Sequence, residues 1–184
     1  MTLSPAAKKL SDAAILHFAE RGYEAASLTT VADAVGIRKA TIYSHFKGKD
    51  ELFLHVYHEA LATERAFMAD CFSQQGAAGE RYLTTLPERY GSSAHLKLLL
   101  RTAFVPPQPV RAEVVKGYEE FTALIKARFV AATPMSGEKV EIFADAYLGI
   151  IDSLYIELLY ASEQAAEKRL AAMWHVFTTA MRAS

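Results

Sequence analysis

The chain has 184 residues, of which 52% are apolar and 11% aromatic, so it can bury a substantial core without disulfides or structural metals. Its net charge of −1 gives no global attraction to a polyanion, and no apolar run approaches the ~18 residues of a membrane-spanning helix. The first residues lack the apolar core of a secretion signal, and the single cysteine, Cys71, excludes an intramolecular disulfide. We therefore expect a cytoplasmic protein with no cofactor and no membrane partner.

The first fifty residues predict three helices separated by glycines. The first is expected over 4–22, starting at Ser4-Pro5, the second over 28–35 and the third over 39–46. Ser27 is the expected N-cap of the second helix, and Gly36 ends it. The inward apolar positions at helical spacing are Leu10, Ala14, Ile15, Phe18, Ala19, Leu28, Val31, Ala32, Val35, Ile42 and Phe46. A short helix pair joined by a glycine turn, after a longer helix, is typical of a helix-turn-helix motif.

The rest of the chain also predicts helices, with breaks at a polar glycine-containing loop (73–80) and at the "PPQP" segment (106–109). The expected helices cover 50–72, 80–90, 93–104, 110–132, 137–161 and 163–182. No stretch shows the alternation of a strand, so the predicted fold class is all-α.

The basic residues of the N-terminal part gather in "GIRKATIYSHFKGK", residues 36–49. This segment holds Arg38, Lys39, Lys47 and Lys49 and no acid, although residues 1–50 as a whole hold seven Lys/Arg against five Asp/Glu. A helix-turn-helix motif inserts its second helix into the DNA major groove, where hydroxyls and cations contact phosphates. The segment therefore predicts a DNA-binding surface, and the alternative is a solvated basic turn between helices.

A longer stretch, "AERGYEAASLTTVADAVGIRKATIYSHFKGKDELF" (19–53), resembles the DNA-binding domain of the TetR family of transcriptional regulators. The resemblance rests on the "GY-x-A-x-S/T", "A-x-x-x-G-I/V", "T-I/L-Y-x-H/Y-F" and "K-x-K-x-x-L" motifs, over about 45 residues from Ala13. It implies a three-helix DNA-binding domain (1–47) followed by a six-helix ligand-binding and dimerisation domain (48–184). It also implies a homodimeric repressor that reads a palindromic operator.

The resemblance assigns DNA contacts to individual residues. Phosphate contacts fall to Thr29, Thr30, Thr41, Ser44, His45 and Lys49, and contacts with bases or backbone in the major groove fall to Lys39, Ala40 and Tyr43. Lys47 flanks the start of the fourth helix, where free N–H groups also attract phosphate. Arg38 departs from the family pattern, which often has Ser or Asn there as a helix cap. We expect Arg38 to exchange that cap for a direct guanine or phosphate contact. The second helix also departs, because its "SLTT" lacks the glutamate of a capping box.

The helix expected over 137–161 is apolar nearly all round, which indicates that it is covered by more than its own domain. This helix and the one expected over 163–182, contributed by each of two subunits, can form a four-helix dimer interface. The residues expected in that interface are Gly149, Ser153, Leu170, Trp174, Phe177 and Met181. The alternative is a crowded core in a monomer, whereas the resemblance favours a dimer.

The middle helices carry more aromatic residues than short helices can cover. A pocket for a small apolar effector is predicted from Met68, Phe72, Phe104, Tyr118, Phe121, Phe143 and Tyr147. The alternative for each of these residues is an ordinary core position. In the family, ligand binding re-aims the long fourth helix and with it the recognition helices.

Two further groups of polar residues have competing interpretations. Asp152 lies in the most apolar predicted helix, where it would either meet a cationic effector or make a contact at the dimer interface. Glu51, His55 and His58 share a helix face, but no third histidine or cysteine reinforces a metal site, so no metal is expected. Because the chain also lacks phosphate-loop, nucleophile-elbow and zinc-protease motifs, an enzyme is not expected. A helical interaction module without DNA binding remains the other rival.

Overall fold

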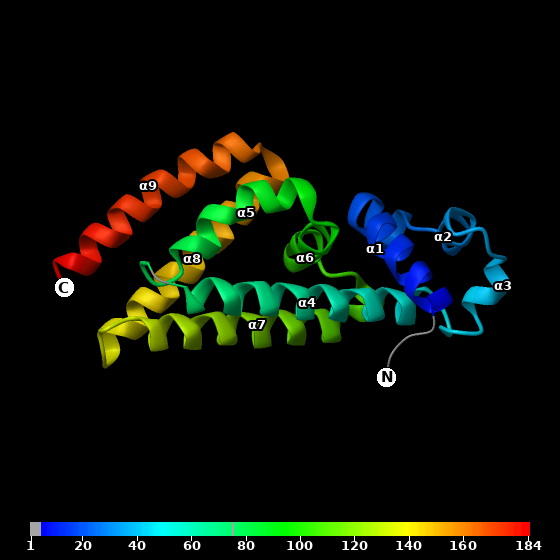
Figure 1. Cartoon of the computed structure of the whole chain (residues 1–184), viewed down its shortest axis with the longest axis horizontal. Coiled ribbons are helices and arrows are strands. Elements are labelled where there is room, and N and C mark those ends of the chain that lie inside the picture. The colour runs from blue at the N-terminus through cyan, green and yellow to red at the C-terminus, as the bar shows by residue number, and fades with distance from the viewer. Residues whose placement is uncertain (1–4, 75) are drawn as a thin grey trace. The chain divides into compact units, whose positions relative to one another are not determined.

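The computed structural model describes residues 5–74 and 76–184, and every regular element in that part of the chain is a helix (Figure 1). The elements are α1 (Pro5–Ala25), α2 (Leu28–Ala34), α3 (Lys39–Ile42), α4 (Lys49–Ser73), α5 (Glu80–Ser92), α6 (Ala94–Phe104), the short η1 (Gln108–Val110), α7 (Arg111–Ala132), α8 (Glu138–Tyr160) and α9 (Glu163–Arg182). The predicted all-α class is confirmed. Ser4, the expected start of the first helix, lies outside the described residues. No helix of the described part is long and apolar enough to span a membrane.

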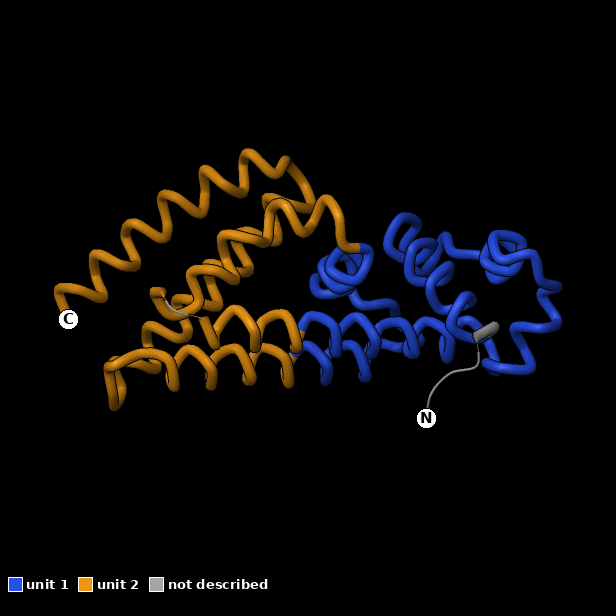
Figure 2. The backbone as a smooth tube through the Cα atoms, viewed as in Figure 1, with its two compact units in different colours: residues 1–64, 94–118 blue, residues 65–93, 119–184 orange. Residues whose placement is uncertain are grey.

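The chain divides into two compact units (Figure 2). Unit 1 comprises residues 1–64 and 94–118, and unit 2 comprises residues 65–93 and 119–184. Helices α4 and α7 each contribute residues to both units. The predicted domain boundary after residue 47 is a different division, based on the DNA-binding motif, and it stays a prediction.

Unit 1 is built around an aromatic cluster that joins α1 to α4. The Phe53 ring packs edge-on against Phe18 and against Tyr23, with ring centroids 5.1 Å apart in each pair. Phe18 and Phe53 are completely buried, and Tyr57 stacks on Phe53. This cluster anchors the two helices that flank the predicted helix-turn-helix segment in the sequence.

The end of α1 differs from the prediction. Gly22 leaves helical geometry as expected, with φ at 73°, but the chain resumes a further turn that reaches Ala25. Tyr23 in that turn is buried, and its hydroxyl donates a hydrogen bond to Asp50 of α4. Burial and this hydrogen bond raise the pKa of Tyr23 above its ordinary value, so the phenol stays protonated and remains a donor.

The turn between α2 and α3 follows directly from Gly36. The Ile37 N–H donates to Ala32 O (3.0 Å) and the Gly36 N–H donates to Asp33 O (3.1 Å), which together form a Schellman motif. Gly36 has φ of 70°, a backbone conformation that L side chains rarely adopt. The glycine therefore ends α2 and sets the direction in which α3 begins.

Unit 2 is centred on Tyr147 of α8, which is completely buried. Its ring stacks on Phe129 with centroids 4.9 Å apart, and Phe72, Trp174 and Phe177 surround it. The Tyr147 hydroxyl donates to Gly79 O at 2.8 Å. Burial raises the pKa of Tyr147 well above its ordinary value, so this hydroxyl keeps its proton.

Candidate nucleic-acid interface

Helices α2 and α3 present one buried face and one exposed face. Ile42 is completely buried and Phe46 is nearly so, which fixes the opposite side of the segment toward solvent. The exposed side carries Thr29, Thr30, Arg38, Lys39, Ala40, Thr41, Tyr43, Ser44, His45 and Lys47. Every residue assigned to DNA contact except Lys49 therefore lies on the exposed surface.

Helix α3 is shorter than the expected span of 39–46, because regular helix ends at Ile42. Beyond it, the N–H groups of His45 and Phe46 both donate to Ile42 O at 2.9 Å, so the chain continues as turns. The Ser44 hydroxyl donates to Thr41 O at 2.7 Å and closes the first of these turns. Tyr43 lies at this turn with 52% of its surface exposed, so its ring is accessible to a ligand on this face.

The cations of this surface are not neutralised by neighbouring acids. Within the described residues, the side chains of Arg38, Lys39 and Lys47 form neither an ion pair nor a hydrogen bond, whereas Lys8 of α1 pairs with Asp12 at 3.2 Å. The exposed face of α3 is thus a basic surface with open hydrogen-bond donors. Such a surface suits the phosphate oxygens and base edges of DNA.

Arg38 occupies the N-cap position of α3, as the sequence predicted. Its backbone is extended (φ −77°, ψ 143°), and its side chain makes no capping hydrogen bond. The Arg38 carbonyl accepts the Thr41 N–H at 2.8 Å, so the helix starts without a side-chain cap. The guanidinium is therefore free for another partner.

Lys49 differs from the other predicted contacts, because it is half-buried and engaged within unit 1. Its ammonium donates to the backbone oxygen of Glu24 (3.1 Å) and lies 4.4 Å from the centre of the Tyr23 ring. A phosphate contact by Lys49 stays a prediction, and it would compete with these interactions.

Two local contacts in unit 1 have no counterpart in the predictions. The Glu51 carboxylate accepts the Lys47 N–H at 2.6 Å, which stabilises the start of α4 in the manner of a capping box. His17 Nε2 accepts the Ser27 N–H at 3.1 Å, while the Ser27 side chain makes no cap bond. The "KDE" sequence after Gly48 was a usable signal for the first contact, but nothing local indicates the second.

The residues considered for a metal have other roles in the structure. Glu51 is engaged with Lys47, and the His55 ring packs 5.2 Å from the Phe46 ring. Among residues 5–74 and 76–184, no group of three or more His, Cys, Asp or Glu side chains is arranged to hold a metal ion.

The residues predicted to line an effector pocket fall in both units. In unit 2, Met68, Phe121 and Tyr147 are buried, and the half-buried Phe72 and Phe143 join the aromatic cluster around Tyr147 and Phe177. Phe104, which is 41% exposed, and the half-buried Tyr118 belong to unit 1. The assignment of all seven residues to one pocket stays a prediction.

The residues predicted for a dimer interface show different degrees of burial. Gly149 is exposed and open to solvent, and Ser153 accepts a hydrogen bond from Arg169 at 3.2 Å. Leu170 and Phe177 are buried within unit 2, and the half-buried Trp174 donates to Glu80 at 3.0 Å. Met181 and Asp152 are half-buried.

An apolar groove of about 460 Å³ runs along α8 and α9 in unit 2. It is lined by Phe143, Ala146, Ile150, Ala172, Met173, Val176, Phe177 and Ala180. Val176 is 68% exposed there, and Ile142 and Ile156 of α8 are also largely exposed. Ala172 and Val176 are exposed along this groove, whereas Phe177, which also lines it, is largely buried.

The buried anchors, the Schellman turn and the basic outer face define a helix-turn-helix DNA-binding protein. In agreement with this class, residues 10–56 match the family model described as "Bacterial regulatory proteins, tetR family". Residues 10–56 therefore carry a DNA-binding domain of the TetR type, and the chain is similar to TetR-family transcriptional regulators.

Comparison with known proteins extends this similarity beyond the matched segment. The chain is 25% identical over 146 residues to the HTH-type transcriptional repressor KstR2 of Rhodococcus jostii, and the match covers 79% of this chain but less than two thirds (63%) of KstR2. A solved TetR-family regulator from Agrobacterium tumefaciens superposes with a TM-score of 0.74 at 16% identity, covering 95% of this chain and 96% of that one. The regulator FadR of Bacillus subtilis, solved in complex with stearoyl-CoA, superposes with a TM-score of 0.62 at 18% identity, covering 91% of this chain and 97% of that one. The two structures show a shared fold over nearly the whole chain.

Proposed function

We propose that this chain is a dimeric repressor that binds a palindromic operator and is released when a small apolar effector occupies its C-terminal part. The observation that carries the proposal is the exposed, unneutralised basic face of α3, held in place by Ile42 and Phe46. A recognition helix needs this combination of a rigid inner face and open donors outside. Repression rather than activation rests on the name of KstR2 and on the habit of the family.

The roles of the α3 side chains follow from their chemistry. Lys39 and Tyr43 face bases or backbone in the major groove, since a cation can bind guanine and an aromatic edge can contact a thymine methyl. Thr29 and Thr30 supply hydroxyls for phosphates at the start of α2. Arg38 contacts guanine or phosphate with the guanidinium that no cap or acid engages.

In this proposal, a second copy of the chain occupies the α8–α9 groove and forms the dimer. Its lining is almost wholly apolar, and Gly149 beside it leaves room for the close approach of another helix. Two copies related by a two-fold axis would place four helices together, and two α3 helices would then meet two operator half-sites. In this arrangement Asp152 contacts the partner subunit rather than the effector.

The effector is proposed to be apolar because the centre of unit 2 is aromatic. Phe72, Phe143 and Tyr147 belong to one cluster of rings there, and Met68 is buried with them in the same unit. The similarly folded FadR was solved with stearoyl-CoA, a ligand with a long apolar chain. Coupling between two binding sites is reciprocal. Operator DNA would therefore lower the affinity for the effector by the same factor by which the effector lowers the affinity for DNA.

Replacing Val176 with glutamate should convert the dimer to a monomer and abolish tight operator binding. A carboxylate at the centre of an apolar interface meets its symmetry mate, and burying it costs several kcal/mol, which is a hundredfold or more in dimer affinity. Sedimentation equilibrium measures the dimer dissociation constant, and gel shift measures operator binding.

The matched control is Leu16→Glu, which introduces the same charge at an apolar residue of α1 that is 55% exposed. It should leave the sedimentation behaviour unchanged. A Val176→Glu variant that remains as dimeric as the unmodified chain would show that the groove does not bind a second copy.

A further inference from the structure

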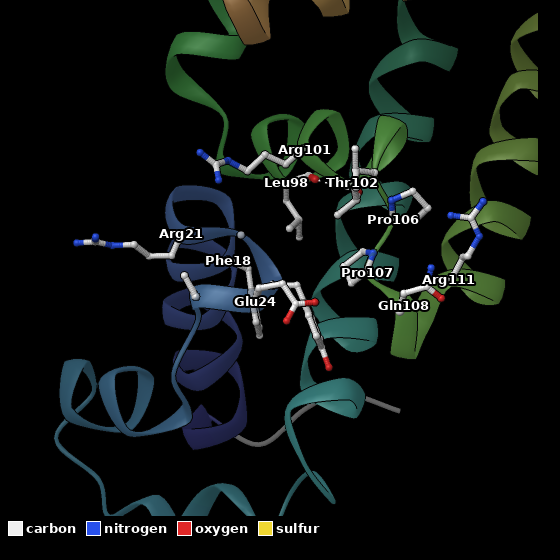
Figure 3. Close-up of a pocket in the computed structure, with 14 residues that line it drawn as sticks. Phe18, Arg21, Glu24, Leu98, Arg101, Thr102, Pro106, Pro107, Gln108 and Arg111 are labelled. Atoms are coloured by element: carbon white, nitrogen blue, oxygen red, sulfur yellow. Dashed lines mark hydrogen bonds between the residues drawn. The ribbon is translucent and has the colours of Figure 1, made fainter.

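A second concave site lies entirely within unit 1, apart from the face of α3 and from the residues assigned to the effector. It is a cleft of about 400 Å³ between the end of α1, helix α6 and the proline-rich segment that leads into α7 (Figure 3). Its floor and walls include Phe18, Leu98, Val105, Pro106 and Pro107. The volume is within the usual range for sites that bind small organic molecules.

Three arginines line this apolar cleft, and none of them is neutralised. Arg21, Arg101 and Arg111 form no ion pair or hydrogen bond within the described residues. In Figure 3, Arg21 and Arg101 extend to the same side, and Arg111, the first residue of α7, lies on the other side. One carboxylate, Glu24, also lines the cleft, so three arginines and one glutamate give a formal charge of +2.

Arg101 lies close to the backbone of Gly22 in this cleft. A Cβ built on Gly22 would lie 3.4 Å from its guanidinium nitrogen, so the side chain lies directly over the glycine. The Arg101 guanidinium has no acceptor within the described residues. The Thr102 hydroxyl donates to Leu98 O at 3.0 Å, and no hydrogen bond joins it to Arg101 in the described part of the chain.

We infer that this cleft binds a small organic anion, a carboxylate or phosphate carried on an apolar body. The apolar walls accept the body, and the arginine forks accept the anionic group by charge-assisted hydrogen bonds. Neither half of the ligand suffices alone. An inorganic anion would leave the exposed Val105 and the half-buried Pro107 uncovered, and a neutral apolar molecule would leave the guanidinium groups without an acceptor.

The test is isothermal titration calorimetry of the full chain with three probes: 1-naphthoate, its neutral analogue 1-naphthalenemethanol, and inorganic phosphate. Naphthoate should bind with one site per chain, and the other two should bind at least about tenfold more weakly. Arg21→Gln and Arg101→Gln, which change the two arginines on the same side of the cleft, should each weaken naphthoate binding about tenfold with an unchanged thermal midpoint. The control Arg128→Gln removes an exposed arginine of α7 that does not line the cleft, and it should bind naphthoate as the unmodified chain does.

Three outcomes would overturn the inference. The first is naphthoate affinity within twofold of the unmodified chain in both arginine variants, which would place the probe elsewhere, as in the apolar α8–α9 groove. The second is equal binding of the neutral analogue. The third is the absence of any naphthoate binding up to millimolar concentration.

Discussion

Replacing Arg38 and Lys39 together with glutamine is expected to weaken operator binding about a thousandfold without unfolding the protein. Both side chains are exposed and have no partner within the described residues, so neither contributes to the core. A dimer loses four contacts with DNA, and at roughly 1 kcal/mol each the loss is about 4 kcal/mol. Fluorescence anisotropy over a range of salt concentrations measures the affinity and its salt dependence. The slope of log K against log salt concentration should become shallower by up to about four.

The matched control changes the net charge equally at sites outside the interface. Arg128→Gln with Lys168→Gln removes two exposed cations of unit 2 and should leave the salt slope unchanged. A separate variant, Arg38→Ser, restores a side-chain cap to α3 and should bind DNA more weakly even though the helix start is better capped. If Arg38→Ser keeps the original affinity and slope, the proposed contact by Arg38 is wrong.

The second large effect is expected in unit 2, where Gly79→Ala should destabilise the fold by about 2–5 kcal/mol. Gly79 has φ of 74°, which costs an L residue roughly 1–2 kcal/mol. The added Cβ would also lie against the Tyr147 hydroxyl, closer than any ordinary contact, and overpacking of this kind costs roughly 1–3 kcal/mol. Tyr147 cannot move aside easily, because it is completely buried and stacked on Phe129. Urea denaturation gives the free energy of unfolding.

Gly36→Ala separates the two contributions, since Gly36 has a similar φ of 70° but a Cβ added there would meet nothing within 4 Å. It should cost only the backbone contribution of about 1–2 kcal/mol, and Gly36→Asn should cost less because asparagine tolerates this conformation. Equal losses for Gly79→Ala and Gly36→Ala would mean that the clash with Tyr147 does not contribute to the instability.

The sequence predicts the order and type of the helices well because glycine, proline and apolar periodicity act locally. Gly36 ends α2 as expected, and the "PPQP" segment separates α6 from α7. The exceptions arise where distant contacts override local signals. The turn after Gly22 persists in unit 1, where Tyr23 and Glu24 bind Asp50 and Lys49 from another helix.

The candidate site is predictable to a similar extent. Burial of Ile42 and Phe46 follows from helical spacing, so the exposure of Arg38, Lys39 and Tyr43 could be predicted residue by residue. The hydrogen bond from Lys49 to the Glu24 backbone oxygen could not be predicted in this way, because that oxygen lies 25 residues earlier in the chain.

The apolar residues of α9 show a second respect in which the sequence does not predict the structure. Spacing identifies an apolar face but cannot separate residues that pack within unit 2 from those left exposed. Leu170 and Phe177 are buried there, while Val176 is exposed. Similarly, Gly79 and Tyr147 are 68 residues apart, and no local pattern links them.

The most direct test of the proposed function is selection of duplexes from a random DNA pool by the purified chain, followed by competition at about 50 and about 200 mM salt. The proposal predicts enrichment of a palindrome with half-sites about one helical turn or a multiple of it apart. The selected palindrome should be bound at least about 10³-fold more tightly than a shuffled duplex at the higher salt concentration. Enrichment of no sequence, or equal affinity for the selected and shuffled duplexes, would contradict it.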